Sequence, residues 1–213
     1  LLSEACREYN IHLIADEIAV GFGRTGTMFG FQQAKITPDI ICLSKGITGG
    51  YMTLSTILTT DDIYDAFYDE YEKLNAFLHS HSYTANPIAC SAANATLDIF
   101  KDKDVIKKNK ILSAHMRKCF ESLKDHPHVS DVRQKGMVLA IELIKDKKRK
   151  LSYDWKERRG IRAYLHGLKN NVLMRPLGNV LYFMPPYVIT KKEISFVSEI
   201  MKEGVDEATK KNS

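Results

Sequence analysis

The chain has 213 residues, of which 44% are hydrophobic and 27% are charged, and its net charge is +5. This balance excludes a disordered or low-complexity chain, and the length accommodates one full domain or parts of two. No apolar run approaches the roughly 20 residues of a transmembrane helix, so we expect a soluble protein without a membrane partner.

Residues 1–10 resemble a helix already under way and contain neither an initiator Met nor the layout of a signal peptide. We therefore expect a fragment that lacks an upstream portion. The basic run at residues 145–150 is interpreted as a solvated loop, not as a nucleic-acid-binding patch. Isolated cysteines without metal-binding spacing indicate free thiols in a reducing cytoplasm: Cys6, Cys42, Cys90 and Cys119.

The first half of the chain predicts an α/β arrangement. Residues 11–18 and 39–46 are short apolar runs typical of buried parallel strands, and residues 54–60 form a third, β-branched run. Asp61 and Asp62 fit the start of a helix. Residues 88–102 are rich in alanine and follow Pro87, which predicts a buried helix with the proline in its first turn.

The second half predicts a smaller α+β domain, and we place the boundary near Asp102 to Val105, giving domains 1–104 and 105–213. Its last helix begins with a capping box from Thr190 to Glu193. The other expected elements are an amphipathic helix at 105–126, a strand at 136–144, a helix at 155–171, and a strand pair at 171–176 and 180–186.

Gly21, Gly23 and Gly26 spell the G-x-G-x-x-G pattern of a dinucleotide-binding loop. That loop should follow a strand directly and open a helix whose N-terminus holds the pyrophosphate. Here Asp16 and Glu17 lie between strand and glycines, where their charges would repel a diphosphate, and no helical stripe follows Gly26. We therefore assign the glycines to a tight backbone turn.

Asp16 and Lys45 end two predicted parallel strands, the edge at which open α/β sheets gather ligand groups. Two interpretations are open. The first is an ordinary ion pair. The second is a pyridoxal phosphate site, in which the lysine forms a Schiff base as the free amine and the aspartate keeps the pyridine nitrogen protonated.

Three blocks of the sequence resemble the class III aminotransferases of pyridoxal phosphate fold type I, in that family's order. They are LIADEIAVGFGRTG at 13–26, PDIICLSKGITGG at 38–50 and HSHSYTANPIAC at 79–90. The resemblance covers the whole chain and corresponds to the C-terminal half of the family's chain. It implies part of the large, mostly parallel mixed sheet domain, a small C-terminal α+β domain, and a cytoplasmic homodimer with sites at its interface.

Two further blocks, at 51–60 and 174–190, resemble the branch of the family that serves biotin biosynthesis. The resemblance implies conversion of 8-amino-7-oxononanoate to 7,8-diaminononanoate, with S-adenosylmethionine as amino donor. Lysine as donor stays open. The alternatives are an ornithine-type or ω-amino-acid:pyruvate aminotransferase, an aminomutase, or a non-catalytic interaction module.

The resemblance also implies roles for individual residues at the cofactor. Lys45 is the Schiff-base lysine and proton shuttle, Asp16 is the partner of the pyridine nitrogen, and Ile18 packs on one ring face from a position further along the strand. Ser82 binds the cofactor phosphate across the dimer interface, with the amide of His81 or Ser82 beside it. A polar loop before a helix is the alternative for this segment.

The remaining implied roles concern the substrate. Arg175 grips the carboxylate of the keto acid, a contact that suits its planar fork; a surface arginine is the alternative. Tyr182 lines the same site, or is a core aromatic residue. Ser80 lies close to the substrate, where family members often have glycine, which leaves the shape of the pocket in doubt. His79 and His81 lack a third ligand, so we expect no metal site.

Overall fold

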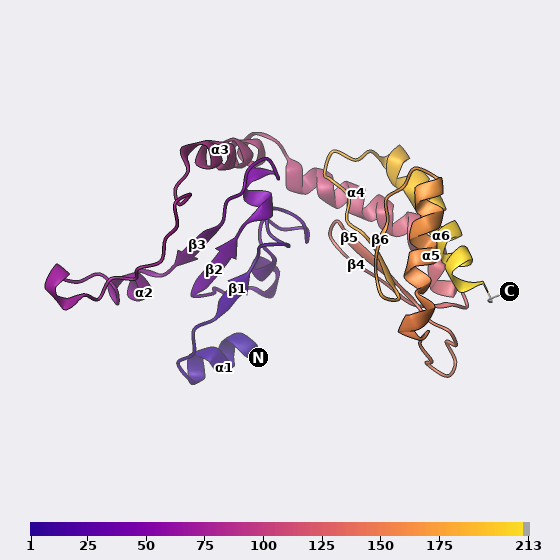
Figure 1. Ribbon diagram of the computed structural model, residues 1–213, viewed down its shortest axis with the longest axis horizontal. Helices are drawn as coiled ribbons and strands as arrows, with labels where there is room; N and C mark the ends of the chain where they lie inside the picture. Colours follow the sequence, from indigo (N-terminus) through magenta and orange to yellow (C-terminus); the bar gives the residue numbers. More distant parts are fainter. Residues whose placement is uncertain (211–213) are drawn as a thin grey trace. The chain divides into compact units, whose positions relative to one another are not determined.

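The structure is a computed structural model that describes residues 1–210 (Figure 1). The chain divides into two compact units, residues 1–106 (unit 1) and residues 107–213 (unit 2). The sequence places a boundary between residues 104 and 105, and that these units are separate domains stays a prediction. Within residues 1–210, no helix combines the length and the apolar character needed to cross a membrane.

Unit 1 contains a three-stranded sheet with the order β1-β2-β3. Strands β1 (Ile14–Asp16) and β2 (Ile40–Leu43) are parallel, and β3 (Thr56–Thr59) is antiparallel to β2. Each strand falls within one of the three apolar runs of the sequence, so their existence is confirmed. The helix α1 (Leu2–Glu8) precedes the sheet, and α2 (Asp61–Asp65) follows it at the predicted acidic start.

The other helices of unit 1 are short 3-10 turns and one long α-helix. The turns are η1 (Gly30–Ala34), η2 (Lys45–Thr48) and η3 (Tyr71–Lys73). Helix α3 (Pro87–Asp102) begins as predicted: the Asn86 side chain accepts hydrogen bonds from the backbone N–H groups of residues 88 and 89, at 2.9 and 3.2 Å.

Unit 1 buries much less than the sequence predicts. Only Ala89 and Ala93 are buried on α3, and Ile14 on β1 is 59% exposed. The predictions of a buried α3 and of a buried first strand are therefore wrong for the described chain. An apolar run predicts that a segment is buried, but it does not specify which residues bury it. The described residues of unit 1 bury only the region around η2, with a core of Phe22, Leu43, Ile47 and Ala93.

Unit 2 is an antiparallel sheet with the order β4-β5-β7-β6. Its strands are β4 (Val129–Lys135), β5 (Val138–Leu143), β6 (Arg175–Leu177) and β7 (Val180–Phe183). Helix α4 (Val105–Phe120) begins at the end of unit 1 and lies mostly in unit 2. The other helices of unit 2 are η4 (Glu121–Asp125), η5 (Trp155–Glu157), α5 (Arg159–Lys169) and α6 (Lys191–Thr209).

One face of this sheet carries the core of unit 2. Leu139, Ile141 and Leu143 alternate along β5 and are at most 1% exposed, and they share a buried cluster with residues of α4, α5 and α6. Helices α5 and α6 lie side by side (Figure 1). The predicted capping box of α6 is confirmed, since Thr190 Oγ1 accepts from Glu193 N at 3.2 Å and Glu193 Oε2 accepts from Thr190 N at 2.7 Å. The opposite face of the sheet is open.

Strand β4 has no counterpart in the sequence prediction. Its residues are mostly polar and exposed, and it is an edge strand that pairs only with β5, where polar residues are common. The predicted solvated loop at 145–150 is confirmed: it is a turn of largely exposed residues after β5.

Candidate functional site

Asp16 and Lys45 lie at the carboxyl ends of neighbouring parallel strands. Asp16 is the last residue of β1 and pairs in register with Cys42 of β2, and Lys45 begins η2, two residues after β2 ends. Both side chains are exposed, and they form no ion pair with each other. The ion-pair interpretation is therefore wrong, and an amine and a carboxylate are presented separately at the same sheet edge.

The carboxylate of Asp16 is oriented by the backbone that follows it. Its Oδ1 accepts a hydrogen bond from Ile18 N at 3.0 Å, a local turn that fixes the side chain relative to the strand end. Ile18 itself lies in that turn, half-buried, beyond the last residue of β1. The prediction that Ile18 continues along the strand is wrong, because the chain turns directly after Asp16 and Glu17.

The backbone of Lys45 is in the left-handed region, with a φ of 45°. A non-glycine residue rarely adopts this conformation, and it persists only where the surroundings hold it. Two contacts hold the chain here: Ser44 Oγ donates to Leu54 O at 2.8 Å, and Ile47 N donates to Ser44 O at 3.1 Å. The direction in which Lys45 points is therefore set by its neighbours.

The glycine-rich loop packs directly against the lysine turn. The Phe22 ring is 3% exposed and lies so close to Gly46 that a Cβ on Gly46 would be 2.9 Å from Phe22 Cδ2. Phe29 packs edge-on against Phe22, with 5.7 Å between ring centroids. The loop thus has a structural role at this site, because it presses an aromatic ring against the residue that follows Lys45.

Glu17 ties the two parts of this loop together, a role that the sequence reasoning missed. Its side chain is buried, and Oε2 and Oε1 accept hydrogen bonds from Gly30 N and Phe31 N at 2.9 and 2.8 Å. These donors open η1, so the carboxylate occupies the start of that turn. The sequence signal for this role is the alternation of side chains along an extended chain, which points Glu17 to the opposite side from Asp16. Residues 26–29 are not helical, so the helix that a dinucleotide-binding loop opens does not follow Gly26 directly.

The segment from Ser80 to Ser82 is exposed and leads into a turn at residues 82–85 before α3. His81 N donates to Thr84 Oγ1 at 3.1 Å, so the backbone donor of His81 is already occupied. The amide and hydroxyl of Ser82 make no hydrogen bond within the described part of the chain. Of the two amides named for the phosphate, the structure leaves the one of Ser82 available. Residues 1–210 contain no group of three or more potential metal ligands.

Arg175 and Tyr182 are register partners on β6 and β7, so their side chains share one face of the sheet. That face is the open one, since the core of β7 is built by Leu181, which is 1% exposed. Tyr182 is half-buried there, and the alternative of a core aromatic residue is wrong. Arg175 is exposed and has no hydrogen bond or ion pair with any residue of the described chain.

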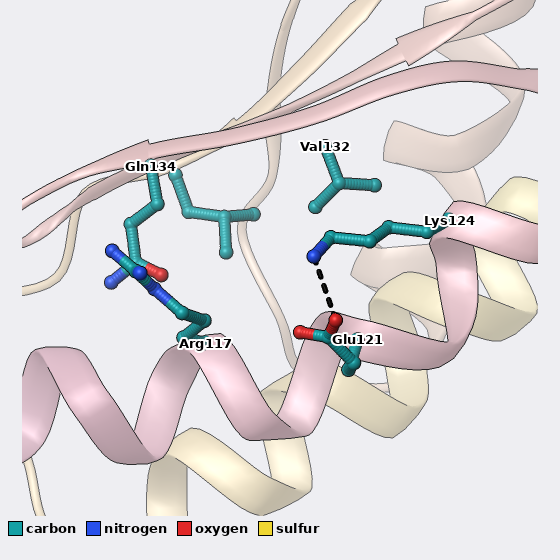
Figure 2. Close-up of a pocket in the computed structure, with 6 residues that line it drawn as sticks. Arg117, Glu121, Lys124, Val132 and Gln134 are labelled. Atoms are coloured by element: carbon teal, nitrogen blue, oxygen red, sulfur yellow. Dashed lines mark hydrogen bonds and ion pairs between the residues drawn. The ribbon is translucent and has the colours of Figure 1, made fainter.

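A pocket of about 190 Å³ lies in unit 2 between α4, η4 and β4 (Figure 2). Lys124 Nζ donates to Glu121 Oε1 at 2.7 Å at its rim, and the pocket includes none of the predicted site residues. It opens on the face of the sheet that the helices cover, opposite Arg175. Its lining residues are Arg117, Glu121, Lys124, Val132, Gln134 and Leu139.

Comparison with known proteins links these residues to one family. The family described as aminotransferase class III matches residues 1–205. The adenosylmethionine-8-amino-7-oxononanoate aminotransferase of Helicobacter pylori is 47% identical over 209 residues, 96% of this chain and 46% of that protein. The relative of the same name from Geobacter sulfurreducens is 44% identical over 97% of this chain and 46% of its own. The chain thus spans about half the length of the curated relatives it matches.

Solved structures of similar proteins also superpose closely on the chain. The enzyme of the same name from Methanocaldococcus jannaschii superposes with a TM-score of 0.93 at 41% identity, over 97% of this chain and 48% of that one. An omega transaminase from Pseudomonas jessenii, in complex with PMP, gives a TM-score of 0.92 at 29% identity, over 98% of this chain and 46% of the other.

Proposed function

This chain belongs to the class III aminotransferases, and from that premise we propose that the whole protein transfers an amino group to 8-amino-7-oxononanoate, forming 7,8-diaminononanoate for biotin biosynthesis. The observation that carries the choice of substrate is the extent of the identity to relatives of that name, at 44 to 47% over nearly the whole chain. The amino donor in this proposal is S-adenosylmethionine, in line with the names of these relatives.

The fold is that of pyridoxal phosphate fold type I, and the cofactor of the family is pyridoxal 5′-phosphate. The residues of unit 1 fit this group. It needs an amine and a carboxylate at one edge, and Lys45 and Asp16 supply them from adjacent strands without neutralising each other. When bound, the cofactor supplies an electron sink for the bonds at the substrate's Cα.

Two side chains of the chain act at the reacting atoms in this proposal. Lys45 Nζ would hold the cofactor covalently until the amine of the donor replaces it there, and the lysine amine so released would carry the proton that leaves the donor's Cα. The carboxylate of Asp16, oriented by Ile18 N, would accept a hydrogen bond from the protonated pyridine nitrogen and stabilise its positive charge. Ile18, which lies in the same turn, would pack on one face of the ring, and Phe22 packs against Gly46 next to Lys45.

Ser82 has a proposed role at the cofactor phosphate of a second copy of the chain. Its hydroxyl and amide have no partner in the described chain, and the segment around it exposes large apolar side chains. Contiguous exposed apolar surface is typical of an interface, so we assign it to a homodimer contact. The exposed members of this segment are Tyr64, Phe67, Tyr68, Tyr71, Leu74, Phe77, Leu78 and Tyr83.

Arg175 is the proposed partner of the substrate carboxylate. Its guanidinium is exposed, unpaired within residues 1–210 and adjacent to Tyr182 on the open sheet face. A bidentate contact to a carboxylate uses two of its N–H groups, and Tyr182 lines the same surface. Ser80, which is exposed just before the turn at residues 82–85, is proposed to lie near the substrate.

A donor and acceptor screen on the complete protein tests this function. We expect turnover with 8-amino-7-oxononanoate and S-adenosylmethionine, and little with ornithine or with ω-amino acids and pyruvate. The second candidate is a general ω-aminotransferase, which the high superposition on an omega transaminase favours. Turnover with pyruvate and ω-amino acids, but none with 8-amino-7-oxononanoate, would establish that candidate and refute the first.

A further inference from the structure

The open face of the unit 2 sheet carries two arginines in one row. Arg133 of β4 is the register partner of Ala140 on β5, Ala140 pairs with Tyr182 on β7, and Tyr182 pairs with Arg175 on β6. Register partners of antiparallel strands project from the same face. The two guanidinium groups therefore stand at opposite edges of one sheet, with a small residue and Tyr182 between them.

The two arginines differ in their partners. Arg133 Nη1 donates to Glu142 Oε2 at 2.7 Å and to Asp131 Oδ2 at 3.2 Å. These carboxylates raise the pKa of Arg133 above its ordinary value, with the hydrogen bond to Glu142 as the largest cause. Arg175, by contrast, makes no ion pair within the described residues. The charge of Arg133 is therefore balanced by carboxylates of the sheet, whereas the guanidinium of Arg175 is available to a ligand.

Glu142 lies on the same face, in the next row, and is the acidic residue of the sheet nearest to Arg175. That row runs from Asp131 through Glu142 and Val180 to Leu177, so only uncharged residues separate Glu142 from β6. Two strand spacings of about 4.8 Å and two residues of about 3.4 Å place the Cα atoms of Glu142 and Arg175 about 12 Å apart. A glutamate and an arginine side chain can bridge that span together.

We propose that Arg133 is a positioning residue: by holding the Glu142 carboxylate at the β4 edge of the sheet, it keeps the Arg175 guanidinium free for the carboxylate of the acceptor substrate. This inference rests on the proposed function of Arg175. The Arg133–Glu142 pair itself is half exposed and contributes little to stability. Its effect is instead to decide which of the two arginines the Glu142 carboxylate pairs with.

The test compares variants of the complete protein in KM for 8-amino-7-oxononanoate and in the Kd of nonanoate, a carboxylate that cannot react. Arg133→Gln should raise both by about twofold to fivefold, the ratio that corresponds to one exposed ion pair, and leave kcat nearly unchanged. Arg133→Gln combined with Glu142→Gln should restore both values, and Arg133→Lys should retain them. Lys135→Gln, which removes a positive charge from the same strand and face, is the matched control.

Two outcomes overturn the inference. The first is an Arg133→Gln variant with unchanged KM and Kd, and the second is a double variant in which removal of Glu142 restores neither. Arg175→Gln separates this inference from the proposed function. If Arg175→Gln raises KM and Kd while Arg133→Gln does not, only the inference about Arg133 fails. If Arg175→Gln changes neither, the proposed role of Arg175 fails and takes the inference with it.

Discussion

The two units of the chain are nearly equal in length but very different in what they bury. Among residues 1–210, the core of unit 2 contains seventeen buried hydrophobic residues, and the cluster around Phe22 in unit 1 contains four. Unit 2 covers one face of its sheet with its own helices, whereas unit 1 leaves Ile14 and much of α3 exposed. Unit 1 nevertheless carries Asp16 and Lys45, so the proposed chemistry lies where the described chain supplies the least cover.

A small set of contacts in unit 1 is therefore enough to fix the turn that contains Lys45. The contacts that define the lysine turn are local: Phe22 against Gly46, Ser44 bonded to Leu54 O, and Glu17 bonded to the start of η1. Unit 2 contributes a sheet that is well packed on one face, and the side chain of Arg175 projects from the opposite, open face. We expect changes in unit 1 to affect chemistry first, and changes in the core of unit 2 to affect stability first.

The largest effect is expected from Lys45→Ala. Loss of the amine removes both the covalent link to the cofactor and the proton carrier, and a positioned proton-transfer group typically contributes about 10²–10⁴-fold to the rate. Turnover by the complete protein should fall by at least that factor, with the thermal unfolding of the protein little changed. Lys35→Ala is a matched control, since Lys35 is an exposed lysine with a φ of 54° in the same unit. Equal losses in both variants would contradict a specific role for Lys45.

The next largest effect is a difference between the two units in how much an isoleucine-to-alanine substitution lowers stability. Ile141→Ala empties a fully buried position in the core of unit 2 and should lower the free energy of unfolding by about 2–5 kcal/mol. Ile14→Ala makes the same chemical change at a position that is 59% exposed in the chain, and a surface change of this kind typically stays within about 0.5 kcal/mol. Urea unfolding of the chain measures both. A comparable loss from Ile14→Ala would mean that β1 is buried as tightly as β5.

A smaller effect is expected where the glycine loop meets the lysine turn. Gly46→Ala places a Cβ 2.9 Å from the Phe22 ring, and such overpacking typically costs about 1–3 kcal/mol. Because the strain falls next to Lys45, turnover should fall with stability. Phe22→Leu in the Gly46→Ala background should recover part of the turnover, since it removes the ring atoms that clash. No recovery would show that Phe22 does not set the lysine turn.

The smallest effect concerns acid. Glu157 accepts a 2.9 Å hydrogen bond from Arg159 Nε, which holds the pKa of Glu157 below its ordinary value of 4.5. A carboxyl whose folded-state pKa is depressed adds stability above its unfolded pKa and loses it as the pH falls through the folded value. Glu157→Gln should therefore flatten the loss of stability below about pH 4.5, measured by unfolding at several pH values. Glu199→Gln, at an exposed position of α6, is the control. An acid limb of unchanged steepness in Glu157→Gln would contradict the account.

Much of the fold follows from local patterns in the sequence. Pro87 marks the first turn of α3, the Thr190–Glu193 pair marks the start of α6, and three apolar runs mark β1, β2 and β3. The placement of Asp16 and Lys45 at one edge of the sheet also follows from the sequence, because the carboxyl ends of parallel strands meet there.

The features that sequence reasoning missed depend on contacts distant in the chain. Strand β4 carries few apolar residues, since it is an edge strand paired on one side only. Glu17 reaches donors thirteen and fourteen residues later, and no local pattern specifies that contact. The exposure of Ile14 could not be foreseen, because an apolar residue does not specify what covers it.

The measurement that tests the central claim most directly is reduction of the complete, pyridoxal-phosphate-loaded protein with borohydride, followed by peptide mapping. The account predicts a visible absorption band that reduction removes, and a phosphopyridoxyl group on the peptide that contains Lys45. The absence of that group from Lys45, or its presence on another lysine such as Lys35, would contradict the assignment of this site.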